Sequence, residues 1–255
     1  MNSGTLLDEL MMRKREGRSA FAVLVDPDKT PADHGSRLAE RCEGAGVDYL
    51  LVGGSLVLTD HLESFILNFK KETSIPVLIF PGSPSQVTPA ADALLYLSLI
   101  SGRNPELLIG QHVISAPVVR ASGLEVLSTG YMVIDGGVPT TVSYMSGSAP
   151  IPATKPDIAL CTAWASELLG QHVLYMDAGS GAKHPIPAEM IRTVAENTTR
   201  PLFVGGGMRT AEGVAAAATA GATVVVVGNA LEANPEAMGE LAKSVHRSAR
   251  VSVSQ

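Results

Sequence analysis

Short apolar runs alternate along the chain with longer segments that have helical periodicity. The apolar runs are continuous in hydrophobicity, which is typical of strands buried on both faces of a parallel sheet. Eight runs have strand length, at residues 20–25, 49–52, 76–80, 93–97, 131–134, 173–176, 201–204 and 223–227. Helical periodicity occupies residues 32–45, 60–71, 105–121, 156–170, 187–198, 210–220 and 235–248.

Eight such strand and helix units in 255 residues predict one α/β domain, a closed (β/α)8 TIM barrel that spans residues 1–255. An open doubly wound sheet of this length more often has fewer strands. We expect the barrel to be modified at its third helix, because Pro81, Pro84 and Pro89 disfavour a helix there. Residues 136–153, rich in Gly, Ser, Thr and Pro, are predicted to form a long loop over the barrel mouth.

Glycine-rich turns follow the last three predicted strands. Strand six ends in Asp177 and continues into Ala178-Gly179-Ser180-Gly181, and Gly205-Gly206-Gly207 and Gly228-Asn229 follow strands seven and eight. Backbone N–H groups of such turns bind anions, and the loops after strands seven and eight are the recurrent phosphate site of this architecture. Tight turns that need positive φ are the alternative explanation. Because three consecutive strands share the feature, we predict a phosphate site.

Two hard oxygen ligands lie at the ends of neighbouring strands. Asp26 ends strand one and Ser55 follows strand two. This pair suits Mg²⁺, which one or two protein groups hold while substrate phosphates complete its shell, and it therefore implies a diphosphate substrate. Asp26-Pro27-Asp28 is also an ordinary turn and helix-capping sequence, and capping is the better explanation of the tripeptide taken alone. Its place opposite the three glycine turns favours the metal role.

Composition argues against several classes of function. A net charge of −6 without a basic run argues against a nucleic-acid partner. No apolar run reaches the ~20 residues of a membrane span, and residues 1–18 do not resemble a signal peptide. Cys42 and Cys161 give no disulfide framework, so we expect a cytoplasmic protein. Nucleotide-binding fingerprints are absent, and the histidines lack metal-ligand spacing.

Taken together, the motifs resemble the geranylgeranylglyceryl phosphate synthases, with the heptaprenylglyceryl phosphate synthases as related enzymes. The segments that carry the resemblance are FAVLVDPDK (21–29), VGGS (52–55), SLISGRNPELLIG (98–110), YMDAGSG (175–181), VGGGMR (204–209) and VGN (227–229). The resemblance implies a Mg²⁺-dependent prenyltransferase of ether-lipid biosynthesis. Such an enzyme joins geranylgeranyl diphosphate to the 3-hydroxyl of sn-glycerol 1-phosphate and releases diphosphate.

The same resemblance implies a role for individual residues. Asp26 and Ser55 are the expected metal ligands, and Asp177, helped by Tyr175, is the expected catalytic group for the glycerol hydroxyl. The implied glycerol phosphate site consists of Tyr175, Met176, Asp177, Ala178, Gly179, Ser180, Gly181, Gly206, Gly207, Gly228 and Asn229. Relatives of the heptaprenyl type carry a lysine where this chain has Leu24, so a phosphate contact from strand one must come from Lys29 or be missing. The Asp-Ala-Gly-Ser-Gly turn indicates the geranylgeranyl branch.

Two other functions stay open at this point. Asp26 and Asp135, at the ends of strands one and five, could form the acid/base pair of a sugar-phosphate isomerase or cyclase. A non-catalytic phosphometabolite-binding barrel would keep the glycine turns but has no need of Asp26, Ser55 and Asp177 together. Only 17% of residues are charged, which is compatible with a homo-oligomer, and an apolar product is compatible with transient membrane contact.

Overall fold

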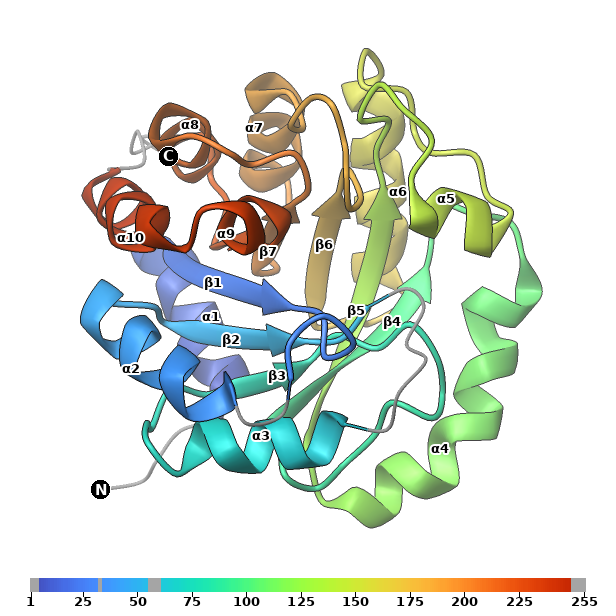
Figure 1. Ribbon diagram of the computed structural model, residues 1–255. Helices are drawn as coiled ribbons and strands as arrows, with labels where there is room; N and C mark the ends of the chain where they lie inside the picture. Colours follow the sequence, from blue (N-terminus) through green and yellow to red (C-terminus); the bar gives the residue numbers. More distant parts are fainter. Residues whose placement is uncertain (1–4, 32–33, 55–60, 249–255) are drawn as a thin grey trace.

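Eight parallel strands form a closed barrel in the computed structural model, which describes residues 5–31, 34–54 and 61–248 (Figure 1). The strands follow one another in sequence order, and β8 pairs with β1. Their bounds are β1 Ala20–Val25, β2 Tyr49–Val52, β3 Val77–Ile79, β4 Ala93–Leu99, β5 Glu125–Val133, β6 Val173–Asp177, β7 Leu202–Gly205 and β8 Val224–Val227. The predicted (β/α)8 barrel is confirmed.

Helices form the outer layer around these strands. The larger ones after β1 are α2 His34–Ala45, α3 Leu62–Lys70, α4 Gln111–Ser122, α6 Pro156–Leu168, α7 Ala188–Glu196, α8 Ala211–Thr219 and α10 Met238–Arg247. Shorter ones are the π-helical η1 Glu106–Gly110, α5 Thr141–Ser146, α9 Asn229–Ala233 and the 3-10 turn η2 Pro235–Ala237. None of the helices in the described ranges is long and apolar enough to span a bilayer.

The connection from β3 to β4 has no helix, although the structure describes all of residues 80–92. Its three prolines cannot donate the backbone hydrogen bonds of a helix interior. The expected modification of the third β–α unit is therefore confirmed. As a result, this side of the barrel is covered by an irregular segment instead of a packed helix.

The predicted start of β5 and the predicted loop after it both differ from the structure. β5 begins at Glu125, six residues earlier than expected, because its polar residues are accommodated by tertiary contacts. The Glu125 carboxylate accepts hydrogen bonds from the backbone N–H groups of Leu6 and Leu7, each at 2.8 Å. Residues 136–153 are not a plain loop either, since they contain α5, and Ile151 forms an isolated parallel bridge with Ile134 at the end of β5.

An additional helix, α1 Leu6–Glu16, closes the N-terminal end of the barrel. Thr5 and Asp8 form a reciprocal capping box at its start. Leu10 is fully buried and belongs to the core cluster of the barrel interior. The carboxyl ends of the strands, where Asp26 follows β1 and Asp177 ends β6, form the opposite rim.

Candidate active site

Asp177, the last residue of β6, is a buried carboxylate with only neutral hydrogen-bond donors. Its Oδ2 accepts a hydrogen bond from the Tyr131 hydroxyl at 2.6 Å, and its Oδ1 accepts one from the Gly179 N–H at 2.7 Å. Burial raises the pKa of Asp177, and these two bonds lower it only in part. No salt bridge reaches Asp177 within the described ranges. A carboxylate in this state is a stronger proton acceptor than an ordinary aspartate.

The three predicted glycine turns converge around Asp177. Gly206 has φ +83°, and a Cβ there would lie 2.7 Å from the backbone nitrogens of Ala178 and Gly179. Only glycine therefore lets the turn after β7 sit against the turn after β6. The turn after β8 joins them, because the Asn229 side-chain amide donates to Ser180 Oγ at 2.9 Å.

Gly228 shows that positive φ is not the common reason for these glycines. Gly179, Gly181, Gly206 and Gly207 do have positive φ, but Gly228 has φ −118°. A Cβ on Gly228 would lie 3.3 Å from the Leu24 carbonyl oxygen and 3.6 Å from its Cβ. Leu24 therefore packs directly against the turn after β8.

Tyr175 and Met176 occupy opposite faces of β6. Tyr175 is 1% exposed inside the barrel, with its ring stacked on Phe80 at 5.0 Å and on Phe203 at 5.7 Å between centroids. Burial, and next the charge of Asp177, raise the pKa of Tyr175, so its hydroxyl stays protonated. The Met176 side chain belongs to the cluster between strands and helices, away from the barrel interior. Any contact of Met176 with a substrate would thus be through its backbone.

Asp26 lies at the rim end of β1 with its carboxylate beside β2. A Cβ on Gly54 would be 3.5 Å from Asp26 Cγ. Asp26 Oδ1 accepts a hydrogen bond from the Asp28 N–H at 3.1 Å, which is the turn-type contact that the Asp-Pro-Asp sequence predicts. Asp26 Oδ2 lies 3.7 Å from Lys29 Nζ, which is also 3.3 Å from Glu232 Oε2. Lys29 is therefore held between two carboxylates.

The donor set at this position fits a hard divalent cation. Magnesium needs one or two protein carboxylates when phosphate oxygens and water fill the rest of its shell, and Asp26 supplies one that is 21% exposed at the rim. The described residues contain no group of three His, Cys, Asp or Glu side chains that could hold a metal by themselves. Ser55, the second predicted ligand, lies outside the described residues.

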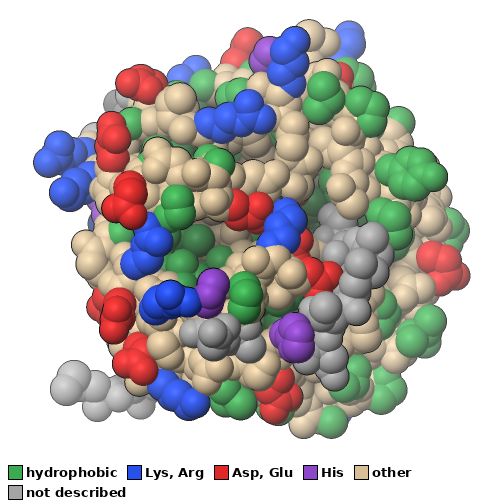
Figure 2. Space-filling model, in the orientation of Figure 1, with side chains coloured by type: hydrophobic (Ala, Val, Ile, Leu, Met, Phe, Trp, Pro, Cys, Tyr) green, Lys and Arg blue, Asp and Glu red, His purple; other side chains and the backbone are tan. Residues whose placement is uncertain are grey.

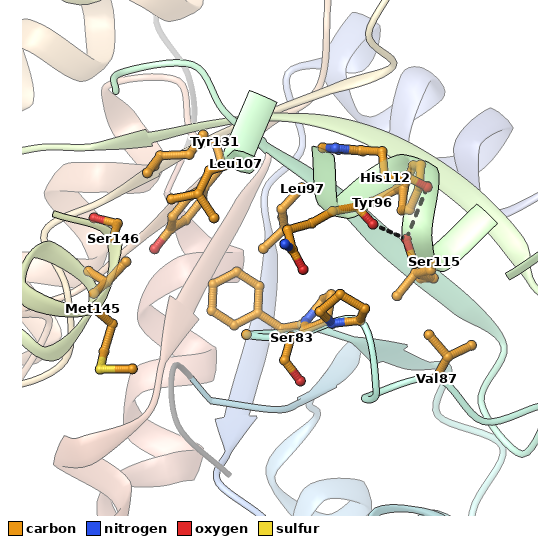
Figure 3. Close-up of a pocket in the computed structure, with 18 of the residues that line it drawn as sticks. Ser83, Val87, Tyr96, Leu97, Leu107, His112, Ser115, Tyr131, Met145 and Ser146 are labelled. Carbon is orange, nitrogen blue, oxygen red and sulfur yellow. Dashed lines mark hydrogen bonds between the residues drawn. The ribbon is translucent and has the colours of Figure 1, made fainter. Parts of the chain in front are cut away.

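A mostly apolar cavity of about 310 Å³ borders both carboxylate regions (Figure 3). Its walls include Gly54, beside Asp26, and Tyr131, which is hydrogen-bonded to Asp177. From there it extends past Leu97 to Ser115 on the inner side of α4. The helix-free connection after β3 supplies another part of its wall, Phe80, Pro81, Gly82, Ser83, Pro84 and Val87. The modified third unit of the barrel thus gives the cavity its room.

Residues 11–245 match the sequence model of the PcrB family. The chain belongs to the PcrB family. It is 58% identical over 240 residues to a geranylgeranylglyceryl phosphate synthase of Chitinophaga pinensis, covering 94% of this chain and 95% of that protein. It is 50% identical over 232 residues to a synthase of the same name from Spirosoma linguale, covering 91% and 93%.

A solved structure of a PcrB-family relative agrees with the fold over nearly the whole chain. The crystal structure of (S)-3-O-geranylgeranylglyceryl phosphate synthase from Thermoplasma acidophilum superposes with a TM-score of 0.89 at 32% identity. The match covers 95% of this chain and 99% of that one. The relative was crystallised in complex with its substrate, sn-glycerol 1-phosphate.

Two residues of the candidate site were missed by sequence reasoning. Tyr131 lies in β5 directly beside Tyr175 of β6, so pairing of the strands brings its hydroxyl to Asp177. His112 lines the cavity, and its Nε2 lies 3.0 Å from Ser98 Oγ. Burial lowers the pKa of His112, which favours a neutral ring. The only signal for Tyr131 was its place in a strand, and the sequence does not reveal which strand position faces Asp177.

Asp135 does not have the surroundings expected of a catalytic partner of Asp26. Its side chain is exposed, and Oδ1 accepts a hydrogen bond from the Gly137 N–H at 2.9 Å. This is a local turn contact. Asp177, by contrast, is 8% exposed and lies beside the cavity wall at Tyr131.

Proposed function

We propose that this PcrB-family chain is a prenyltransferase that joins geranylgeranyl diphosphate to the 3-hydroxyl of sn-glycerol 1-phosphate. The observation that carries the proposal is one apolar cavity whose wall includes both Gly54 and Tyr131. Gly54 lies beside Asp26, and the Tyr131 hydroxyl is hydrogen-bonded to Asp177. An apolar chain with a charged end and a separate polar acceptor fits this arrangement. The activity named for the relatives supports it.

The acceptor end is formed by the turns after β6, β7 and β8. Their backbone N–H groups would hold the phosphate of sn-glycerol 1-phosphate, and the short helix α9 after β8 occupies the position that often completes a phosphate site in this fold. Asp177 would orient the 3-hydroxyl and accept its proton as the oxygen attacks C1 of the prenyl group. Tyr131 would hold the Asp177 carboxylate in place, and Tyr175 would support it from within the barrel.

The proposed donor end lies at Asp26, and Ser55 is the expected second metal ligand from the sequence. These two residues would hold Mg²⁺, which when bound would neutralise charge on the departing diphosphate. Lys29 lies 3.7 Å from Asp26 Oδ2, so its ammonium can reach the same diphosphate by exchanging one of its carboxylate contacts. The prenyl C–O bond breaks at this end while the new ether bond forms on the side of Asp177.

The cavity is suited to the prenyl tail. Side chains such as Val87, Leu94 and Leu97 line it, and the hydroxyl of Tyr96 is already satisfied by the carbonyl of His112 at 2.6 Å. A neutral His112 adds no charge to the wall. Burial of an apolar chain here would be driven by removal of its surface from water and would keep water away from the allylic carbon.

A two-phase assay tests the proposed reaction directly. The protein is incubated with radiolabelled sn-glycerol 1-phosphate, geranylgeranyl diphosphate and Mg²⁺, and the mixture is extracted with organic solvent. Label should enter the organic phase only when both substrates are present, and chelation of Mg²⁺ should stop it. An isomerase, a cyclase or a binding protein would leave all of the label in water.

Asp26→Asn provides the matched variant for the metal role. The amide keeps the shape and the turn contact with Asp28 but loses the negative charge that attracts Mg²⁺. We expect about a hundredfold loss of turnover with unchanged thermal unfolding. Wild-type turnover by this variant at saturating Mg²⁺ would contradict the metal role while leaving the prenyltransferase proposal standing.

Three expectations about the surroundings stay predictions. A cytoplasmic location and transient membrane contact follow from the composition and from the apolar product, and liposome flotation with and without geranylgeranyl diphosphate tests the second. A homo-oligomer is the third expectation, and sedimentation of the protein at micromolar concentration tests it.

A further inference from the structure

A wide polar pocket of about 870 Å³ lies at the N-terminal end of the barrel, opposite the rim that carries Asp26 and Asp177. It lies where α1, α7, α8 and α10 end, beside the residues that lead into β1 and β8. Figure 2 shows Lys and Arg side chains at the edge of the molecule where Figure 1 places α10. Against two glutamates, the lining of this basic pocket contains six of the 19 Lys and Arg residues of the chain: Arg13, Lys14, Arg15, Arg18, Arg192 and Arg247.

Structural contacts account for three of these six basic side chains. Arg13 and Arg18 form ion pairs with neighbouring carboxylates, and Lys14 donates a hydrogen bond to the carbonyl of Ala195 at 2.6 Å. The other three are exposed and form no ion pair within residues 5–31, 34–54 and 61–248: Arg15, Arg192 and Arg247. Half of the positive charge of the pocket therefore has no counter-charge in the described structure.

Helix capping explains only part of this remaining charge. Positive side chains in the last turn of a helix stabilise its negative C-terminal end, and Arg15 and Arg247 have that position in α1 and α10. Arg192 lies in the middle of α7, whose last turn contains no basic residue. The effect of a helix terminus is confined to its first or last turn. An anion in the pocket would compensate Arg192 and the two capping arginines together.

We propose that the basic pocket binds a compact anion with two or more phosphate groups. Guanidinium groups bind phosphate oxygens through pairs of parallel hydrogen bonds, and three arginines around one pocket suit a ligand with several phosphates. The chain as a whole has a net charge of −6. Most of its surface therefore repels a polyanion, whereas a basic concavity attracts one and raises its local concentration.

The lining of the basic pocket favours a soluble polyphosphate over a lipid. Ala195 and Ala220 are the only hydrophobic side chains among the described residues that line it. Segments that lie on membranes insert large apolar side chains beside their basic ones, and pockets for organic cofactors are mostly apolar. The pocket thus recognises its ligand by charge. Because it lies at the other end of the strands from Asp26 and Asp177, its occupancy can be tested apart from the proposed reaction.

Calorimetry with inorganic tripolyphosphate tests the site without any substrate of the proposed reaction. EDTA is present throughout, so that no metal ion anchors the anion at Asp26. The wild type should bind tripolyphosphate, and added salt should weaken the binding. Arg192→Ala should reduce the affinity at least ~10-fold, because it removes a charged donor. Absence of binding to the wild type, or equal affinity of wild type and variant, would overturn the proposal.

Three further variants separate the basic pocket from other sources of affinity. Arg120→Ala is the matched control, since Arg120 is an exposed arginine of α4 without an ion pair in the described ranges, and its loss should leave the affinity unchanged. Lys29→Ala, at the rim, should also bind normally. Glu196→Gln removes an exposed negative charge from the pocket and should tighten binding about threefold. A loss of affinity in Lys29→Ala alone would assign the anion to the rim and contradict the proposal.

Thermal unfolding distinguishes a ligand contact from a structural role of Arg192. Without ligand, Arg192→Ala should unfold at the wild-type temperature, because an exposed helix position tolerates alanine. Tripolyphosphate should raise the unfolding temperature of the wild type more than that of the variant. A variant that is destabilised without ligand, and is stabilised by tripolyphosphate as much as the wild type, would show a structural role only and overturn the proposal.

Flotation with phosphatidylglycerol vesicles tests the other source of phosphate groups. Wild type and Arg192→Ala should float to the same extent, because a free polyphosphate and not a lipid headgroup is the expected ligand. Flotation of the wild type that Arg192→Ala abolishes would assign the basic pocket to anionic lipid and overturn the soluble ligand.

Discussion

Two sparingly exposed aspartates at opposite ends of the barrel have opposite electrostatic surroundings. Asp48, just before β2 at the N-terminal end, contacts the guanidinium of Arg13 at 3.0 Å and the ring of His246 at 2.7 Å, and it accepts the Phe21 N–H at 2.8 Å. Burial raises the pKa of Asp48, but these contacts outweigh it and lower the pKa overall. For Asp177, at the rim, burial prevails.

The contrast separates a carboxylate whose charge is compensated from one whose charge is not. Asp48 links α1, α10 and the first two strands through donors that stabilise its charge. Asp177 receives only a phenol and one amide, so the fold leaves its charge poorly compensated. A buried carboxylate with so little charge compensation lowers the stability of the fold. Proteins commonly have such groups at functional sites, where the raised proton affinity serves catalysis. We therefore expect substitutions at the two sites to affect different properties.

The largest effect is expected from Asp177→Asn. The amide can keep the contact with Tyr131 but cannot accept the proton of the glycerol hydroxyl, so kcat/KM should fall by roughly 100-fold to 10,000-fold. The two-phase assay measures this loss. Because ionised Asp177 has a raised pKa, its charge opposes folding at neutral pH, and thermal unfolding of the variant should be unchanged or shifted upward. Loss of activity together with loss of stability would assign Asp177 a structural role.

Asp48→Asn should have the complementary effect, a loss of stability with retained activity. Removing a carboxylate that accepts from charged donors should lower the free energy of unfolding by about 2–3 kcal/mol. Since the folded pKa of Asp48 is lowered, its stabilisation is present above the unfolded value near 3.9 and is lost as pH falls through the folded pKa. Denaturant unfolding at pH 7 and pH 3 should show the difference between wild type and variant shrinking in acid.

The smallest effect is expected from Tyr131→Phe, which removes one hydroxyl and keeps the ring. The Tyr131 hydrogen bond lowers the pKa of Asp177, so its loss should raise that pKa further. A base is inactive while protonated, and the acid limb of kcat/KM should therefore move upward by about one pH unit. A pH profile from pH 4 to 9 measures the shift. An unmoved limb would show that the limb does not report Asp177.

Local sequence patterns were sufficient to predict the barrel and to bring several residues of the candidate site together. Continuous apolar runs predicted all eight strands, and the glycine turns after strands six to eight placed Asp177, Gly206 and Asn229 together. These features depend on chain order and backbone conformation, which short motifs encode. The boundary of β5 was missed because the polar residue Glu125 is satisfied by α1, more than a hundred residues away.

The sequence by itself determined the barrel architecture and the polar residues at the ends of its strands, because hydrophobic period, turn chemistry and strand order are local properties. Tertiary structure alone decided what those residues can do. The pairing of β5 with β6 brought Tyr131 to Asp177. Tertiary contacts lowered the pKa of Asp48, and burial raised the pKa of Asp177. The missing helix after β3 left room for the cavity. Burial and charge compensation depend on contacts between distant segments, and these exist only once the barrel has closed.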